Sequence, residues 1–371
     1  MRSTLKLSFI GGAYNSTIGN VHYISSKLDG RWKLVSGFFS RNRKINLETG
    51  KLYNIEKKRI YSDLQSLIKE EKNKIDAVVV LTSTPSHFKI IKTLLKNKIP
   101  IISEKPLIEE FKEAKSLKKL IKKNNFLRIT YNYTGYPMIR DLKHMIEKKK
   151  FGKIQQINFE MPQDSFTGST KSKILPKKWR LKDRKIPNIC MDLGSHLLNL
   201  SNFLIGDYPN KVMVNYFTNS KYKKIIDNAY FWMKYKSNLN SNFWISKTLI
   251  GARNGLNIRI SGDKKSASWN QMRPEELNIY NLDGTKQVYD RVSQKIVAHK
   301  LRYNRYKAGH PSGFLEAFAN HYLDIADDLI AWRKKGNKNL YTFGLEDSYK
   351  IAKFFEASRV SHHEKSWKSI K

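Results

Sequence analysis

The chain has 371 residues, of which 70 are lysine or arginine and 32 are aspartate or glutamate, so its formal net charge is +38. A hydrophobic content of 40% excludes an intrinsically disordered chain, and the length predicts roughly two domains. The single cysteine, Cys190, excludes an intramolecular disulfide, and we find neither a signal-peptide pattern nor the ~20 apolar residues of a membrane span. We therefore expect a soluble cytoplasmic protein.

The positive charge is spread along the chain rather than gathered in one place. Lysines recur in most of the segments expected to be helical, as in 118–123 and 147–150, and we find no basic tail, zinc-finger spacing or aromatic RNA-binding signature. We therefore interpret the lysines as solvated helix faces and expect no nucleic-acid partner, although a basic nucleic-acid binder stays an alternative. The same field would attract cofactor phosphates and anionic substrates.

The first expected elements are a strand, a glycine turn and a helix. The apolar run Leu5–Ile10 is followed by Gly11 and Gly12, and Gly19 opens a helical pattern. This order is typical of a dinucleotide-binding unit, in which glycines let a pyrophosphate approach the helix N-terminus. Residues 13–18 lengthen the loop beyond the usual glycine spacing, so an ordinary glycine turn stays an alternative.

The second expected strand, Trp32–Phe39, lacks the acidic residue that usually binds the ribose hydroxyl at this point. Ser40 and Arg41 stand there instead, followed by Asn42 and Arg43. A hydroxyl followed by arginines can accept a 2′-phosphate, so we expect NADP to bind at least as well as NAD. The alternative is an exposed basic loop.

Further apolar strands at 75–81, 99–103 and 126–131 alternate with helices, which predicts a parallel α/β sheet over residues 1–130. Ligands of such sheets bind at the carboxyl ends of the strands. Ser103, Glu104 and Lys105 follow one strand directly, and Pro106 keeps Lys105 out of helical geometry. Lys105 could there polarise a substrate oxygen, and the alternative is a surface glutamate–lysine pair.

The second half, 131–371, has a different pattern. Expected helices at 136–149, 188–206, 313–334 and 344–361 surround strand-like segments separated by short turns, and 162–178 reads as a polar loop. Successive strands joined by short turns predict a mainly antiparallel sheet. The expected strands are 154–161, 210–219, 225–236, 241–250, 255–262, 266–270 and 276–281.

Asp192 and His196 lie four residues apart, so on a helix they would share one face. Gly194 between them costs helix stability, about 1 kcal/mol relative to alanine, which indicates that something approaches the backbone there. A histidine can take a hydroxyl proton near neutral pH, and an aspartate beside it can fix its tautomer. The alternative is an aspartate at a helix N-terminus and a histidine packed in the core.

Several motifs occur in a characteristic order: strand-Gly-Gly at 5–12, Ser-Glu-Lys-Pro at 103–106, and the pair Asp192 and His196. The stretches 84–87, 132–137, 179–180 and 309–320 add to them. Together they resemble the Gfo/Idh/MocA oxidoreductases, the family of glucose–fructose oxidoreductase and inositol dehydrogenase. The resemblance covers nearly the whole chain and implies an N-terminal Rossmann domain plus a C-terminal α/β domain with a large, mainly antiparallel sheet.

The resemblance also implies an NAD(P)-dependent dehydrogenase or reductase that acts on a CH–OH group of a sugar, sugar derivative or polyol. His196 would take the hydroxyl proton as hydride leaves the carbon, Lys105 would stabilise the oxyanion, and Asp192 would orient His196 or bind a neighbouring hydroxyl. The implied cofactor-binding residues are Gly11, Gly12, Thr17, Ile18, Ser40, Arg41, Ser83, Thr84, Pro85, His87, Glu104, Lys105, Asn132, Trp179 and Arg180. The implied substrate-binding residues are Lys105, Asn132, Asp192, His196 and His310.

The same resemblance implies a homo-oligomer, a dimer or tetramer, formed through the C-terminal sheet. The runner-up function is a nicotinamide-nucleotide-binding sensor or scaffold that keeps the fold without turnover. Retention of Lys105, Asp192 and His196 together argues against it, and we expect no bound metal because the histidines are scattered and no cysteine pair exists.

Overall fold

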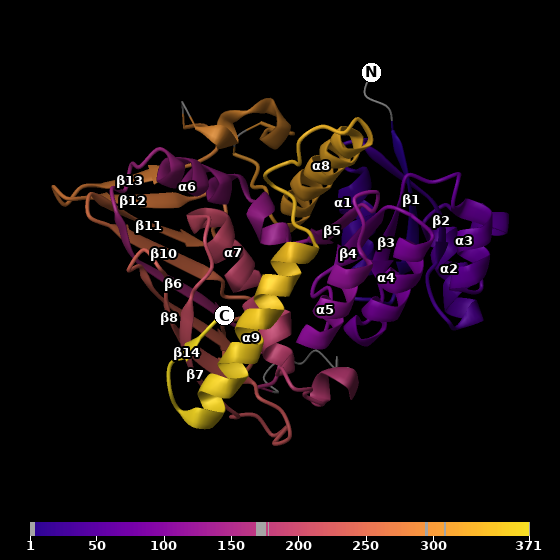
Figure 1. The fold of residues 1–371 in the computed structure, drawn as a ribbon. Coiled ribbons are helices and arrows are strands. Elements are labelled where there is room, and N and C mark those ends of the chain that lie inside the picture. Colours follow the sequence, from indigo (N-terminus) through magenta and orange to yellow (C-terminus); the bar gives the residue numbers. More distant parts are fainter. Residues whose placement is uncertain (1–3, 168–175, 177, 294–295, 308, 371) are drawn as a thin grey trace. The chain divides into compact units, whose positions relative to one another are not determined.

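The computed structural model describes residues 4–167, 176, 178–293, 296–307 and 309–370. Its contacts divide the chain into two compact units, each described by itself below (Figure 1). The first consists of Met1–Ile108, Lys112–Gly135 and Phe314–Ser348, and the second of Glu109–Phe111, Tyr136–Gly313 and Tyr349–Lys371.

The first unit is built on a parallel sheet. In its described part five strands lie in the order β2-β1-β3-β4-β5, and every pairing between them is parallel. All carboxyl ends therefore lie along one edge, as expected of a Rossmann domain. The strands are β1 (Leu5–Gly11), β2 (Trp32–Phe38), β3 (Ala77–Leu81), β4 (Ile101–Glu104) and β5 (Leu127–Thr130). The helices between them are α1 (Gly19–Lys27), α2 (Arg43–Leu52), α3 (Leu64–Glu71), α4 (His87–Lys96) and α5 (Phe111–Leu120).

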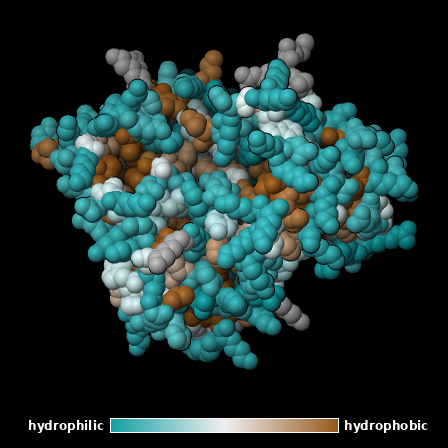
Figure 2. Space-filling view, viewed as in Figure 1, coloured by the Kyte–Doolittle hydropathy of each residue, from teal (hydrophilic) through white to brown (hydrophobic). Residues whose placement is uncertain are grey.

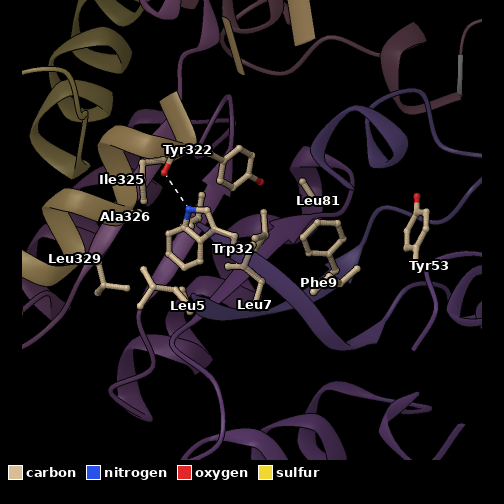
Figure 3. Close-up of a cluster of buried hydrophobic side chains, with 14 of the residues drawn as sticks. Leu5, Leu7, Phe9, Trp32, Tyr53, Leu81, Tyr322, Ile325, Ala326 and Leu329 are labelled. Carbon is tan, nitrogen blue, oxygen red and sulfur yellow. Dashed lines mark hydrogen bonds between the residues drawn. The ribbon is translucent and has the colours of Figure 1, made fainter. Parts of the chain in front are cut away.

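Helix α8 (Phe314–Arg333) completes this unit from far along the sequence. Its apolar side chains join those of β1 and β2 in one buried cluster, and the Trp32 indole donates a hydrogen bond of 2.9 Å to the Tyr322 carbonyl (Figure 3). The sequence placed residues 313–334 in the second domain. Their apolar pattern could not reveal this partner, because periodicity shows which side of a helix is buried but not what buries it.

The second unit contains the expected large sheet. In its described part nine strands lie in the order β13-β12-β11-β10-β6-β9-β8-β7-β14, and every pairing except β6 with β9 is antiparallel. Helices α6 (Pro137–Glu147), α7 (Ser195–Ile205) and most of α9 (Leu345–Glu364) belong to this unit. The strands are β6 (Ile154–Pro162), β7 (Lys211–Phe217), β8 (Asn228–Lys234), β9 (Asn240–Ser246), β10 (Asn257–Gly262), β11 (Lys265–Asn270), β12 (Leu277–Asn281), β13 (Lys286–Tyr289) and β14 (Lys368–Ser369).

The two faces of this sheet differ in character. Along β8, Ala229, Phe231 and Met233 are buried, and Phe231 packs against Phe354 and Phe355 of α9. The alternate positions, Tyr230 and Trp232, are exposed. The alternation of strand side chains thus gives one face covered by helices and one open face.

The surface of the protein is largely hydrophilic. The face visible in Figure 2 is dominated by hydrophilic residues, in keeping with solvated lysines. Among the described residues no helix is both long and apolar enough to cross a membrane.

Candidate active site

The glycine turn after β1 is shaped by close backbone packing. Gly11 and Gly12 have φ of +81° and +72°, and a Cβ on either would come within 3 Å of Leu81. A Cβ on Gly19 would lie 2.2 Å from the Gly12 carbonyl oxygen, and the Ser16 hydroxyl accepts a hydrogen bond from the Gly19 amide. The turn therefore brings backbone, without side chains, up to the start of α1. Thr17 and Ile18 lie directly before that helix.

The segment after β2 forms a hydrogen-bonded turn. The Ser40 hydroxyl accepts a hydrogen bond from the Asn42 amide, and the Asn42 side chain caps α2 by accepting from the Ile45 amide. Arg41 is exposed on this turn. A short capped turn thus presents a hydroxyl and a guanidinium at the carboxyl edge of the sheet.

After β3 the chain turns through Ser83, Thr84 and Pro85 into α4. His87, the first residue of α4, is buried, and its two ring nitrogens each lie 2.9 Å from a backbone carbonyl oxygen, of Thr82 and of Pro106. Burial lowers the His87 pKa, although the two carbonyl groups oppose that shift. His87 was expected to line the dinucleotide, yet both ring nitrogens bind protein. Its ring joins the loop after β3 to the loop after β4.

Glu104 is the last residue of β4, and Lys105 follows it. Lys105 is half-buried, and its peptide bond to Pro106 is cis. The buried Glu104 carboxylate accepts hydrogen bonds from Thr130 at 2.5 Å and from His22 at 3.2 Å. Burial acts to raise the Glu104 pKa, but the His22 contact and the Lys105 charge outweigh it and lower that pKa. Glu104 is therefore a buried charge directly beside Lys105.

Two polar groups at this edge lie buried without a partner in the described part of the chain. They are the side-chain amide nitrogen of Asn132, which follows β5, and the hydroxyl of Thr82, which follows β3. A buried donor without a partner costs about 1–3 kcal/mol, and native proteins rarely leave one so. Together with the glycine turn, these groups fit the polar edges and pyrophosphate of a dinucleotide.

The second unit brings together two residues that the sequence analysis assigned to different roles. Arg180, expected near the nicotinamide, donates from its guanidinium to the carboxylate of Asp192, expected to act in catalysis. The Arg180 guanidinium also lies 4.6 Å from the Trp179 ring centre. Three expected site residues from two separate segments are thus neighbours.

Lys247 joins the same cluster and was missed by the sequence analysis. Its amine lies 2.6 Å from the Asp192 carboxylate and 5.3 Å from the Phe166 ring centre, and the residue is 6% exposed. No sequence signal marked it, because a single lysine after a strand is unremarkable in so lysine-rich a chain. Asp192 is consequently held by two cations, Arg180 and Lys247.

The helix that carries Asp192 and His196 departs from the expected geometry. Cys190–Gly194 forms a π-helix that continues into α7, so the rule placing residues four apart on one α-helical face does not apply across it. His196 is buried in the first turn of α7. A Cβ on Gly194 would lie 2.7 Å from Phe355 of α9, so an aromatic ring is what approaches the backbone at this glycine.

His310 lies outside this cluster of contacts. It is exposed, and its carbonyl accepts a hydrogen bond of 2.8 Å from Arg291, which is also paired with Glu275. Its expected role in substrate binding stays a prediction.

Comparison with known proteins identifies the family to which both parts of the chain belong. Residues 7–133 match the model of the oxidoreductase family NAD-binding Rossmann fold, and residues 143–370 match the model of that family's C-terminal α/β domain. The chain is 28% identical over 335 residues to the uncharacterized oxidoreductase YfiI of Bacillus subtilis. The aligned region covers 87% of this chain and 84% of YfiI.

Solved structures give the same result. The inositol dehydrogenase homolog of Azotobacter vinelandii in complex with NAD+ has a TM-score of 0.90 at 25% identity, covering 99% of this chain and 97% of the homolog. Its complex with NADH and myo-inositol has a TM-score of 0.88 at 25% identity, covering 99% and 98%. The expected fold class is confirmed by these matches and by the two sheets. The chain belongs to the Gfo/Idh/MocA family of NAD-dependent oxidoreductases.

Proposed function

We propose that the protein oxidises a hydroxyl-bearing carbon of a sugar, sugar derivative or polyol, or reduces the corresponding carbonyl. The observation that carries this proposal is Lys105 at the carboxyl end of β4, beside a buried carboxylate, in an NAD-binding Rossmann domain. The homolog bound to NADH and myo-inositol supports the substrate class.

A nicotinamide cofactor bound at the glycine turn supplies the hydride acceptor or donor. The neutral imidazole of His196 takes the proton of the substrate hydroxyl, as histidine does near neutral pH. The ammonium of Lys105 stabilises the negative charge that develops on the substrate oxygen, a contribution often worth about 3–4 kcal/mol. These roles come from the family resemblance and from the chemistry of the residue types.

Of the two roles expected for Asp192, the ion pairs favour the binding of a neighbouring hydroxyl. Its carboxylate is held by Arg180 and Lys247, which fix its position and its charge. A carboxylate held this way can still accept a hydrogen bond from a hydroxyl. We therefore assign Asp192 to binding a substrate hydroxyl next to the reacting carbon, with Lys247 as its support.

Cofactor choice depends on the turn after β2. Ser40 and the exposed Arg41 offer a hydroxyl and a guanidinium where an acidic side chain would repel a phosphate. We propose that NADP binds at least as well as NAD. The Michaelis constants for the two cofactors test this, and a strong preference for NAD would contradict it.

The oligomer is part of the proposal. The open face of the second unit's sheet carries the exposed Tyr230 and Trp232, and Tyr230 stacks on Phe217 and Trp244 with ring centres 5.8 and 5.7 Å apart. Apolar surface of this kind is stabilised by burial against a partner. We propose that a second copy of the chain covers it. The cytoplasmic location stays a prediction.

The function is tested by enzyme assay. The purified protein is examined by mass spectrometry for bound nucleotide, then incubated with NAD or NADP and a set of polyols and sugars that includes myo-inositol, following absorbance at 340 nm. Lys105→Met and His196→Ala should each lower turnover by roughly 10²-fold or more and leave cofactor affinity nearly unchanged.

The matched controls remove the same residue types from the surface: Lys89→Met in α4 and His363→Ala in α9, both exposed in the structure. They should keep full turnover. Full activity in Lys105→Met or His196→Ala would refute the assignment, whereas tight cofactor binding without turnover on any substrate would favour the sensor alternative.

A further inference from the structure

A buried chain of polar side chains leads from α8 to the residue before Lys105. The Tyr322 hydroxyl lies 2.7 Å from Nδ1 of His22, and Nε2 of His22 lies 3.2 Å from the Glu104 carboxylate. His22 is fully buried and Tyr322 is 1% exposed. The three residues come from α1, β4 and α8, so the contacts join three elements that are distant in sequence.

The donor and acceptor of each hydrogen bond in this network follow from the chemistry of the groups. A carboxylate accepts only, so Nε2 of His22 must carry the proton that faces Glu104. The Tyr322 hydroxyl keeps its proton because burial raises the Tyr322 pKa well above its usual value, so this hydroxyl can donate to Nδ1 of His22. Thr130 donates to Glu104 as well. Nε2 of His22 and the Thr130 hydroxyl therefore both donate to the same carboxylate.

The network ends beside a cation. Lys105 follows Glu104 directly, and its positive charge contributes to lowering the Glu104 pKa. His22 itself lies one turn into α1, the helix that begins at the glycine turn. Its ring thus connects the helix expected to meet the cofactor pyrophosphate with the strand end that carries Lys105.

We propose that His22 is a positioning residue, which holds Glu104 as a fixed negative charge beside Lys105. The inference rests on the proposed catalytic role of Lys105. Without the Nε2 hydrogen bond, a buried Glu104 takes up a proton more readily, and the negative charge beside Lys105 is then lost. A histidine that merely fills the core would leave the charge of Glu104 unaffected when replaced.

Other titratable groups also interact with Glu104 and could affect its titration. They are His87 of α4, Tyr131 after β5, and Tyr322. Burial raises the pKa of both tyrosines, so they stay neutral while Glu104 titrates, and it lowers the His87 pKa. The His87 ring is left in place in every variant compared below, so differences in the titration midpoint between those variants report on the hydrogen bonds of His22.

The first measurement needs no activity. In protein labelled with 13C-glutamate and free of cofactor, the Glu104 carboxyl resonance is assigned by its loss in Glu104→Gln and titrated by NMR. His22→Leu should raise its midpoint by about one pH unit or more, a tenfold change in proton affinity. His22→Gln keeps an amide N–H that can face Glu104 and should restore most of the difference.

The second measurement uses the active enzyme. His22→Leu should lower kcat and move the acid limb of the kcat–pH profile upward by the same amount as the Glu104 midpoint, with the cofactor KM nearly unchanged. Tyr322→Phe removes a single oxygen and keeps the ring packed, so it should shift both readouts in the same direction by less. If His22→Leu does not fold, the Tyr322→Phe variant tests the role of His22 instead.

His321→Gln is the matched control. His321 is the neighbouring residue of α8, equally buried, and its Nε2 lies 3.0 Å from the Ile129 carbonyl oxygen rather than from Glu104. It should lower the Tm and leave the Glu104 midpoint unchanged. An unchanged midpoint in His22→Leu and Tyr322→Phe would overturn the inference, as would a shifted midpoint with an unchanged kcat–pH profile. If no Lys105-dependent turnover is found, the proposed function fails and the link to Lys105 falls with it.

Discussion

The two ring nitrogens of His87 both face backbone carbonyl oxygens, although a neutral imidazole carries only one proton to donate. Protonation would satisfy both carbonyls, yet it would place a charge in a fully buried site. Burial is the larger effect, and it lowers the His87 pKa below the usual value of 6.5. The residue that joins the loops after β3 and β4 is consequently neutral at pH 7.

This gives a pH dependence of stability with a definite sign. Below pH 6.5 the unfolded chain binds a proton at residue 87 that the folded chain does not, so the free energy of unfolding falls as the pH falls from 6.5 to the folded pKa. Within that window the slope from this residue approaches about 1.4 kcal/mol per pH unit. Urea unfolding of the wild type and of His87→Gln between pH 5 and 8 measures it.

The variant should lose this part of the slope. His144→Gln, a change at a half-buried histidine of α6, is the control and should keep the wild-type slope. Equal slopes in the wild type and His87→Gln would contradict the expected buried, neutral histidine.

At the scale of elements, the π-helix at Cys190–Gly194 depends on close packing at Gly194. Alanine would favour helix by about 1 kcal/mol, but its methyl group would lie 2.7 Å from Phe355. Overpacking of a core typically costs about 1–3 kcal/mol, so the clash should win. We expect Gly194→Ala to lower the free energy of unfolding by about 1–2 kcal/mol in urea.

A second substitution separates packing from helix propensity. Phe355→Leu removes the ring atoms that the new methyl group would meet. Gly194→Ala should therefore be less harmful in the Phe355→Leu background than in the wild type, a coupling that a double-mutant cycle measures. Additive effects of the two changes would show that Phe355 is not what requires a glycine there.

The elements also show what sequence alone can predict. All five residues of β3 (Ala77–Leu81) are buried, and the continuous apolar run at 75–81 predicted this buried strand. The predicted parallel sheet also placed Glu104 and Lys105 at the carboxyl end of a strand, where the structure has them. Helices α2 and α3 and strands β13 and β14 were not predicted individually. The contacts of His22 and Lys247 were also missed. The partners of His22 lie 82 and 300 residues away in the sequence, and Asp192 lies 55 residues from Lys247.

At the scale of the whole molecule, the open face of the second unit's sheet determines the expected assembly. Trp232 is 45% exposed there, beside Tyr230, in a chain whose positive charge otherwise favours separation of copies. We expect light scattering to give a multiple of the 43.4 kDa chain mass for the wild type and the single chain mass for Trp232→Lys. Charge placed on a buried contact is strongly unfavourable.

Leu340→Lys is the control for that experiment. Leu340 is 80% exposed but belongs to the first unit, so adding charge there should leave the assembly unchanged. A wild-type protein of single chain mass, or an unchanged multimer in Trp232→Lys, would exclude this face as the contact.

The return of residues 314–348 to the first unit has a consequence for how the protein is made. On the ribosome, synthesis begins with the first unit. This unit cannot finish folding until α8 has emerged, and α8 follows nearly all of the second unit in the sequence. A gene fragment that stops at residue 130 would release Leu5, Trp32 and Phe126 to water, since α8 covers the cluster they form. A chimera that exchanges the first unit between relatives must therefore take two separate pieces of the coding sequence, the N-terminal part and the part for residues 314–348.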